Sequence, residues 1–422
     1  MSTPLQPVVA LLVSAAVLLM GNGLLSVLLP VRAGLDAFSQ LDIGIMGSAY
    51  FLGLVIGCLV SPGIIARVGH IRAFAAFAAV ATVTPLCHAI FPLPPVWWLL
   101  RALTGLCFAG LFMGIESWLN AASDRENRGR VLAAYTMLNL TVTTVGMQLS
   151  GLFPARGFEL FSLVAVLYSL AAVPVSLTRT VAPTPPRRSR LRLVWLIGVS
   201  PAAVLACLFT GMVNGAFWTL GPTYAHAAGL GFEEVALFLS AAVLGGALAQ
   251  WPVGLSSDRL GRRPVAALVS AAAALAGLGL VVAAGSQGSR PVLYATAAAF
   301  GAMAFPIYAL AVAHANDLVH RKRAVEVSSG LLLTFSVGAV VGPLAAAALM
   351  QWGGATMLFL LTAVAHGLIV LVMLVRAAQR PALPTARQED YVAVPRTTPA
   401  VFELDPRAAP PEAATTPPEA AR

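Results

Sequence analysis

The 422-residue chain contains little charge and almost no lysine. Asp, Glu, Lys and Arg together make up 10% of its residues, and Lys322 is the single lysine. In soluble domains, charged residues make up about a quarter of the sequence. Hydrophobic residues make up 59% of the chain, and they recur in runs of about 20 residues, the length that crosses a hydrocarbon core about 30 Å thick. The scarcity of charge therefore excludes a soluble protein and indicates a membrane protein.

Signatures of several other protein classes are also missing. The four cysteines lie within apolar runs without paired spacing, which is typical of small buried hydrophobic residues and not of a disulfide or metal site; they are Cys58, Cys87, Cys107 and Cys207. No Gly-x-x-x-x-Gly-Lys phosphate loop occurs, which argues against direct use of ATP. No Ser/His/Asp or Cys/His pattern supports catalysis. We therefore expect neither enzyme activity nor a cofactor or metal.

The apolar runs predict twelve transmembrane helices. Their length and their lack of strict alternation favour helices over barrel strands. The first run has no basic segment before it and is too long for the core of a signal peptide, so we expect it to be retained. The predicted helices cover residues 7–29, 42–64, 73–91, 96–119, 131–152, 158–178, 197–220, 233–255, 264–284, 292–315, 326–350 and 355–376.

The net charge of +9 comes from arginines in the short connections between these runs, so it predicts topology and no nucleic-acid partner. Eighteen Lys and Arg residues lie in the even-numbered connections or directly after the last run, and three lie in the odd-numbered connections. This asymmetry puts both termini in the cytoplasm. A Pro- and Arg-rich linker, 179–196, separates two predicted six-helix bundles, 1–178 and 197–378, and the tail, 379–422, is predicted to be disordered.

The two predicted bundles repeat each other. The matches involve Asn, Pro and Gly at equivalent depths of the predicted helices, which favours a duplicated six-helix unit, as in many secondary transporters. At an offset of 192 residues, Asn22 matches Asn214, Pro30 matches Pro222, Gly53 matches Gly245 and Gly146 matches Gly338; at an offset of 196, Gly105 matches Gly301 and Asn120 matches Asn316.

A charged loop between the eighth and ninth predicted helices carries the most specific motif, Gly-x-x-x-Asp-Arg-x-Gly-Arg-Arg. Its residues are Gly254, Asp258, Arg259, Gly261, Arg262 and Arg263. The loop 192 residues earlier keeps Arg67 and Gly69 but has Ala66 in place of the acid. The motif resembles the signature loop of the major facilitator superfamily. GNGLLSVLLPVRAG (21–34), ESWLN (116–120) and ALAVAHAND (309–317) are similar to the YcaD-like bacterial branch of that superfamily.

The resemblance covers residues 5–378 and implies an all-α membrane protein with two pseudo-symmetric six-helix bundles in a bacterial inner membrane. It implies a secondary transporter that moves a small solute by alternating access, and it names no solute. We expect a monomer whose partners are the solute, the lipid bilayer and protons as coupling ion. Efflux of amphipathic compounds is the first functional hypothesis. Uptake of a metabolite or vitamin-like aromatic solute and a non-transporting receptor or scaffold are the alternatives.

Arg101 is the sharpest candidate for a role in transport. It lies about six residues inside the fourth predicted helix, roughly 9 Å deep at 1.5 Å per residue, where a charge is costly and usually functional or paired. Arg101 with Gly105 also resembles an Arg-x-x-x-Gly motif of proton antiporters in the superfamily, although the Gln before that glycine is absent. The alternative is a structural arginine that snorkels to the surface or binds a carbonyl.

Other side chains in the predicted helices have two interpretations. Asn22 and Asn214 either contact the solute or join helices by hydrogen bonds. Trp218, Phe305 and Tyr308 fall in the seventh and tenth helices, which line the cavity in this superfamily, yet aromatic residues also serve as packing and interface anchors. Glu116 either titrates or pairs with Arg128 or Arg130 in a static gate.

We expect the charged loops to latch the two bundles together at the cytoplasmic side when the cavity faces outward. Asp258 is predicted to meet the start of the fifth helix, which carries Arg128 and Arg130. In the other half the charges are exchanged, and Glu326 is predicted to meet the loop with Arg67, His70 and Arg72. Each such contact contributes about 0.5–1 kcal/mol.

Overall fold

A computed structural model describes residues 5–123, 127–177, 192–285, 289–379, 384 and 388–407. The described residues form helices and contain no strand. Eleven of these helices are long and apolar enough to cross a membrane, when α11 and α12 are counted as one. They are α1 (Leu5–Leu35), α2 (Gln40–Val68), α3 (His70–Ile90), α4 (Pro94–Ala121), α6 (Glu159–Ser176), α8 (Pro201–Ala227), α9 (Phe232–Leu260), α10 (Arg262–Gly285), α11 (Arg290–Ala304) with α12 (Ile307–Asn316), α13 (Ala324–Gly353) and α14 (Met357–Gln379).

The remaining helices differ in part from the expectation. The predicted fifth helix is α5 (Arg128–Gln148) followed by the 3-10 turn η1 (Leu149–Leu152), and α5 does not reach the hydropathy of the eleven. The predicted tenth helix is broken at Pro306, between α11 and α12, because proline lacks the N–H that a continuous helix needs. The last part of the predicted linker forms a short helix, α7 (Leu193–Val199), while residues 178–191 lie outside the described residues.

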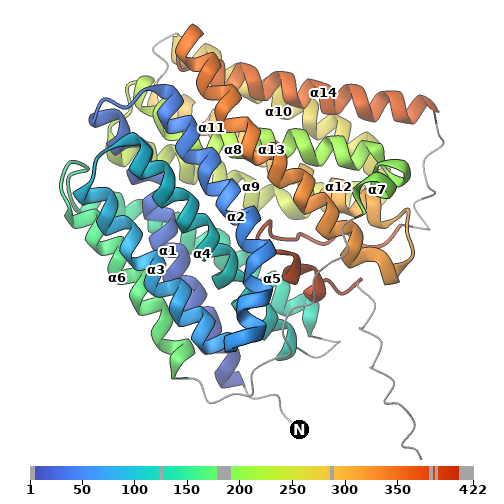
Figure 1. The fold of residues 1–422 in the computed structure, drawn as a ribbon. Coiled ribbons are helices and arrows are strands. Elements are labelled where there is room, and N and C mark those ends of the chain that lie inside the picture. The colour runs from blue at the N-terminus through green and yellow to red at the C-terminus, as the bar shows by residue number, and fades with distance from the viewer. Residues whose placement is uncertain are drawn as a thin grey trace, which may run out of the picture.

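The helices fall into two groups, which Figure 1 shows side by side. In the first group, α1 to α6, α2 packs on α4 and α1 packs on α5 and α6. In the second group, α7 to α14, α8 packs on α13, α9 on α11 and α10 on α14. Consecutive long helices run antiparallel, so the arginine-rich connections share one end of the molecule. We call this the basic end and the other the opposite end.

Glycines allow the helices of each group to cross in backbone contact. A Cβ atom on Gly53 in α2 would lie 2.7 Å from the carbonyl carbon of Ala102 in α4. A Cβ atom on Gly245 in α9 would lie 2.8 Å from the carbonyl carbon of Ala298 in α11. No larger residue fits at such distances, and small residues are typical of close helix crossings in membranes. The two glycines that match at an offset of 192 residues therefore occupy equivalent crossings.

The two groups contact each other directly at the opposite end. Ser48 in α2 donates a hydrogen bond to the carbonyl oxygen of Val340 in α13, at 2.6 Å. Gln148 in α5 donates a hydrogen bond to the hydroxyl of Ser240 in α9, at 2.7 Å. At the basic end the groups diverge, and residues 388–407 lie between them (Figure 1). The space between the groups is therefore sealed at the opposite end.

The segment between the groups corrects one expectation. We predicted disorder for the whole of 379–422, but residues 388–407 have a defined path that ends in the 3-10 helix η4 (Pro399–Leu404). Residues 408–422 lie outside the described residues. We call residues 388–407 the tail segment. Its composition is poor in bulky apolar residues, so its order depends on the cavity that receives it.

Candidate functional site

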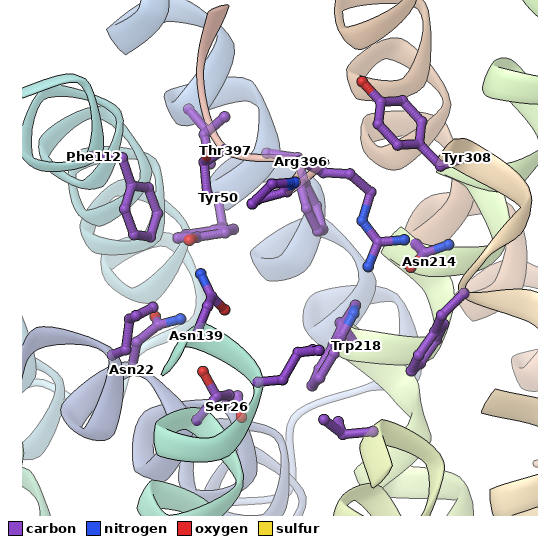
Figure 2. Close-up of a pocket in the computed structure, with 18 of the residues that line it drawn as sticks. Asn22, Ser26, Tyr50, Phe112, Asn139, Asn214, Trp218, Tyr308, Arg396 and Thr397 are labelled. Carbon is purple, nitrogen blue, oxygen red and sulfur yellow. The ribbon is translucent and has the colours of Figure 1, made fainter. Parts of the chain in front are cut away.

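A cavity of about 250 Å³ lies between the two helix groups. The first group contributes α1, α2, α4 and α5 to its wall, and the second contributes α8, α9, α12, α13 and Phe305. Residues 393–397 of the tail segment line it on the side of the basic end. Figure 2 shows Asn22 and Asn139 on one side of this space and Trp218 and Asn214 on the other. Both groups therefore shape a single site.

Arg101 lines the cavity from α4. Its guanidinium carbon lies 4.2 Å from the ring centroid of Tyr50 in α2, a cation–π distance. Gly105, one turn later, makes this contact possible, because a Cβ atom there would overlap the carbonyl oxygen of Tyr50. Among the described residues, the Nε of Arg101 is buried without a hydrogen-bond partner. The structure thus gives Arg101 an aromatic neighbour and a position on the cavity wall.

Amide side chains from three helices reach the cavity. Asn22 in α1 and Asn214 in α8 both line it, as does Asn139 in α5. Asn214 donates a hydrogen bond to the carbonyl oxygen of Thr210 in its own helix, at 2.8 Å, and its Oδ1 is buried without a partner among the described residues. We did not predict Asn139. The signal was the polar spacing of Thr136, Asn139 and Thr143, all of which line the cavity.

Aromatic rings form the wall on the side of the second group. The rings of Trp218 and Phe305 are nearly parallel, with an interplanar angle of 13° and centroids 6.1 Å apart. The ring of Tyr308 lies against that of Phe335, with centroids 5.1 Å apart. All four rings line the cavity. This wall offers flat apolar surfaces, whereas the wall of the first group offers amides and a guanidinium.

The tail segment places a cation against this aromatic wall. The guanidinium carbon of Arg396 lies 5.8 Å from the ring centroid of Phe305 and 5.6 Å from that of Phe335. Burial lowers the pKa of Arg396 to about 10, so the group remains charged at neutral pH. Figure 2 shows its side chain reaching toward Asn214 and Trp218. We did not predict this contact, because Arg396 lies in the segment predicted to be disordered.

Glu116 lies in α4 beneath the tail segment and does not line the cavity. Its carboxylate accepts hydrogen bonds from the hydroxyls of Thr397 and Thr398, and from the hydroxyl of Tyr135 at 3.3 Å. The predicted pairing with Arg128 or Arg130 is not among its contacts in the described part of the chain. The correction has a physical reason, because the tail segment occupies the space beside the carboxylate.

The signature loop holds the other end of the tail segment. Asp258 pairs with Arg262 and accepts a hydrogen bond from the backbone N–H of Tyr391 at 3.1 Å. Arg262 is buried and also donates to Asp317 at 3.1 Å. Burial raises the pKa of the Asp317 carboxyl, while the Arg262 guanidinium acts in the opposite direction. A Cβ atom on Gly254 would overlap the ring of Tyr391.

The two charged loops share a backbone feature even though one lacks the acid. Gly261 ends α9 with φ +92°, and Gly69 ends α2 with φ +85°, a region in which glycine is favoured. The repeat therefore extends to the helix ends.

The other predicted gate residues differ in their exposure to solvent. Arg67, Arg72, Arg130 and Arg259 are exposed, and Arg128 is half-buried. Arg263 donates a hydrogen bond to the carbonyl oxygen of Arg376 at 3.3 Å, and the centroid of the buried His70 ring lies 5.7 Å from that of Trp118.

Neither predicted latch contact is formed in this conformation. Asp258 is engaged by the tail segment, and Glu326 lies 3.6 Å from Arg192. The latch was predicted for the state in which the basic end closes, whereas here the groups touch at the opposite end. The latch therefore stays a prediction.

Comparison with known proteins gives the family. The sequence model of the Major Facilitator Superfamily matches residues 11–289 and 203–409. The uncharacterized MFS-type transporter YcaD of Escherichia coli strain K12 is 28% identical over 391 residues, covering 92% of this chain and 100% of the relative.

Solved structures share the fold. The nucleoside transporter NupG superposes with a TM-score of 0.70 at 14% identity, covering 90% of this chain and 99% of the other. A bacterial homologue of the iron transporter ferroportin, in an inward-facing state, superposes with a TM-score of 0.69 at 14% identity, covering 90% and 100%. At such identities the likeness shows the fold alone. Family match, relatives and fold agree that this multi-pass membrane chain belongs to the major facilitator superfamily of transporters.

Proposed function

We propose that the chain is a secondary transporter that moves a small amphipathic solute across a bacterial inner membrane by alternating access. The observation that carries this proposal is the cavity, which both helix groups line and which their direct contacts seal at the opposite end. Rocking of one group against the other would open the sealed end and close the basic end. With the basic end in the cytoplasm, this conformation faces inward.

We infer twelve transmembrane helices in two six-helix bundles, with α5 as the fifth. The low hydropathy of α5 has a local cause, since Thr136, Asn139 and Thr143 face the cavity and not the lipid. The equivalent glycine crossings at Gly53 and Gly245 support a duplicated unit. Twelve membrane-spanning helices would also return the chain to the side of the membrane on which it began. The positive-inside rule makes that side the cytoplasm.

The walls of the cavity suggest the chemistry of the solute. A planar apolar part would lie against Trp218 and Phe305, and polar groups would meet Asn22, Asn139 and Arg101 on the facing wall. Ligand sites combine apolar surface with a few placed polar groups in this way. We favour efflux of such compounds. Uptake of an aromatic metabolite would use the same walls, and the assay below separates the two directions.

We further propose coupling to protons, with Glu116 and Arg101 as the groups involved. The Glu116 carboxylate accepts hydrogen bonds from three hydroxyls, which can stay in place when the carboxylate gains or loses a proton. Glu116 lies on the side of the cavity that the tail segment covers, so withdrawal of that segment would expose it. Arg101 lies 15 residues earlier on the same helix, about 22 Å along its axis at 1.5 Å per residue, so it would respond through a rearrangement of α4 and not through direct contact.

The test is accumulation of a labelled compound panel in cells that lack or overproduce the chain, with and without a protonophore. We expect overproduction to lower the accumulation of an amphipathic aromatic compound, and the protonophore to remove the effect. Glu116→Gln should remove it too, at an unchanged amount of protein in the membrane. Higher accumulation would replace efflux by uptake, and a panel without any transported compound would favour a receptor or scaffold.

A further inference from the structure

The tail segment is more deeply buried than a passing surface loop. Val401, Phe402 and Leu404 in η4 have exposed fractions of 0%, 1% and 0%. They pack into the same hydrophobic core as the long helices. Thr398 and Asp405 are buried as well. Burial of this extent, in a segment that follows the last long helix, indicates a docking site built by the rest of the chain.

The first group holds the segment through polar contacts on α4. Thr397 and Thr398 donate hydrogen bonds to the carboxylate of Glu116. Asn120, one turn further along α4, donates a hydrogen bond to the carboxylate of Glu403 at 2.9 Å. These contacts place η4 against α4 and α5.

The second group holds the segment through the signature loop. The ring of Tyr391 packs on Gly254, its N–H donates to Asp258, and its hydroxyl donates to Gln250 at 2.6 Å. Two residues earlier, Glu389 pairs with Arg321, accepts from Arg262 and donates its N–H to Asp317. Arg396 then crosses to Phe305 and Phe335. The segment therefore bridges both groups across the mouth of the cavity.

We propose that the tail segment is a built-in inhibitor and that the mouth of the cavity at the basic end is its binding site. Docked, it blocks entry from the basic end, and Arg396 fills the aromatic side that a solute would use, a point that rests on the proposed function. It also stands between the groups where they must meet for the basic end to close. The segment must therefore leave the mouth before a transport cycle can run.

The tether makes such inhibition effective without tight binding. Eight residues, 380–387, join α14 to the tail segment, and a chain of that length spans at most about 28 Å. A short tether gives an effective concentration in the millimolar range. A docking interaction that would be weak for a free peptide is therefore sufficient to keep the mouth occupied. Conversely, a modest loss of contacts releases it.

Docking can be tested on the full-length chain without any solute. On a background in which the four native cysteines are replaced by serine, Asn120→Cys with Glu403→Cys should form an intramolecular crosslink under oxidation. The pair Leu152→Cys with Glu403→Cys is the control, because Leu152 is exposed at the opposite end. A protease site inserted between residues 380 and 387 reports the crosslink, since a crosslinked tail stays attached after cleavage.

Closure of the mouth is measured with a second probe, Ser26→Cys, a near-isosteric change on the cavity wall beyond the tail segment (Figure 2). Its reaction rate with a polar maleimide, added from the basic end in inverted vesicles, should be low in the parent chain. Phe402→Ala should raise this rate by about thirtyfold, the effect of truncating a buried anchor at an interface. Asp390→Ala is the matched control, because Asp390 is an exposed residue of the same segment.

Tyr391→Ala, which removes a different anchor, should raise the rate like Phe402→Ala, and both chains should keep the elution profile of the parent in detergent. A missing crosslink between positions 120 and 403, or equal rates for Ser26→Cys in the parent and both variants, overturns the inference. Neither probe uses a solute. If the compound panel shows no transport even with the Phe402→Ala chain, in which the segment is released, while the probes respond, the proposed function fails and the inhibitor stands. If transport is seen and the probes do not respond, the reverse holds.

Discussion

The close helix crossings at glycine allow a prediction about the stability of the folded protein, and this prediction also concerns the candidate functional site. Gly105 in α4 and Gly301 in α11 match at an offset of 196 residues and face equivalent backbone. A Cβ atom on Gly105 would lie 3.0 Å from the carbonyl carbon of Tyr50, and one on Gly301 would lie 2.6 Å from that of Ala242. Ordinary contacts of a Cβ atom begin at 3.4 Å. Alanine at either position would therefore push two packed helices apart.

The destabilisation caused by the added Cβ atom can be separated from the effect of helix propensity by a matched control. Gly367 in α14 has no atom within 4 Å of its would-be Cβ, so Gly367→Ala changes propensity alone, by about 1 kcal/mol in favour of alanine. Overpacking costs typically 1–3 kcal/mol. The obstacle here is backbone, which cannot rotate away, so we expect the upper end. Gly105→Ala and Gly301→Ala should each be about 2–3 kcal/mol less stable than Gly367→Ala.

Equilibrium unfolding in mixed detergent micelles, followed by tryptophan fluorescence, measures these differences. The two variants should then differ in function at equal stability. Gly105→Ala moves Tyr50 away from Arg101, whereas Gly301→Ala leaves that pair untouched, so transport should fall further in the first. If both variants are as stable as Gly367→Ala, the helices are not in backbone contact and the account of the crossings is wrong.

Two further predictions concern topology and the buried charge. A reporter fused after Arg192 should be cytoplasmic and one fused near Gln287 periplasmic; the opposite result would invert the map of the chain. Arg101→Ala should abolish transport at a normal amount of membrane protein, and Arg101→Lys should restore it only partly, because an ammonium cannot spread its charge over the Tyr50 ring as a planar guanidinium does. Near-normal transport by Arg101→Ala would leave the residue a structural role.

Much of the long-helix pattern followed from the sequence because the bilayer imposes it. Apolar length and the spacing of arginines depend on local composition, and Arg101 was found because a charge is conspicuous among apolar neighbours. Its aromatic partner Tyr50 was not, since the contact depends on a crossing set by Gly105. In the repeat, Gly146 faces the carbonyl group of Met20, and the corresponding contact to the carbonyl group of Met212 is made by Gly342, whereas Gly338 faces the carbonyl group of Leu208 and the backbone nitrogen of Met212. A shift of four residues keeps the same helix face and is hard to see in sequence.

The tail segment could not be predicted from local signals. Its apolar residues are few and separated by Pro, Thr and Arg, which is a composition typical of disorder. Its order comes from partners far away in the chain, above all Glu116 and Asp258, which neither periodicity nor composition links to it. The same separation along the chain explains why the neighbours of Glu116 were not foreseen. The sequence offered Arg128 and Arg130 as nearby cations, whereas the structure fills the space beside the carboxylate with Thr397 and Thr398.

The last prediction concerns Asp258, which binds the tail segment in this conformation and is predicted to form the latch when the cavity faces outward. Asp258→Asn should speed the labelling of Ser26→Cys in the parent chain, because it weakens the contact with the N–H of Tyr391. In the Phe402→Ala chain, where the segment is already released, only the latch remains to be weakened.

A partly exposed contact worth about 0.5–1 kcal/mol shifts a balanced equilibrium by a factor of about two to five. We therefore expect a second, smaller rise in labelling when Asp258→Asn is added to Phe402→Ala. The charged loop of the first group does not complicate the attribution of this second rise to the latch. Ala66 offers no carboxylate there, and the tail segment accordingly binds the first group through Glu116 and Asn120 on α4. If Asp258→Asn acts in the parent chain and has no effect beside Phe402→Ala, the carboxylate serves the tail segment alone, and the latch between the charged loops does not exist.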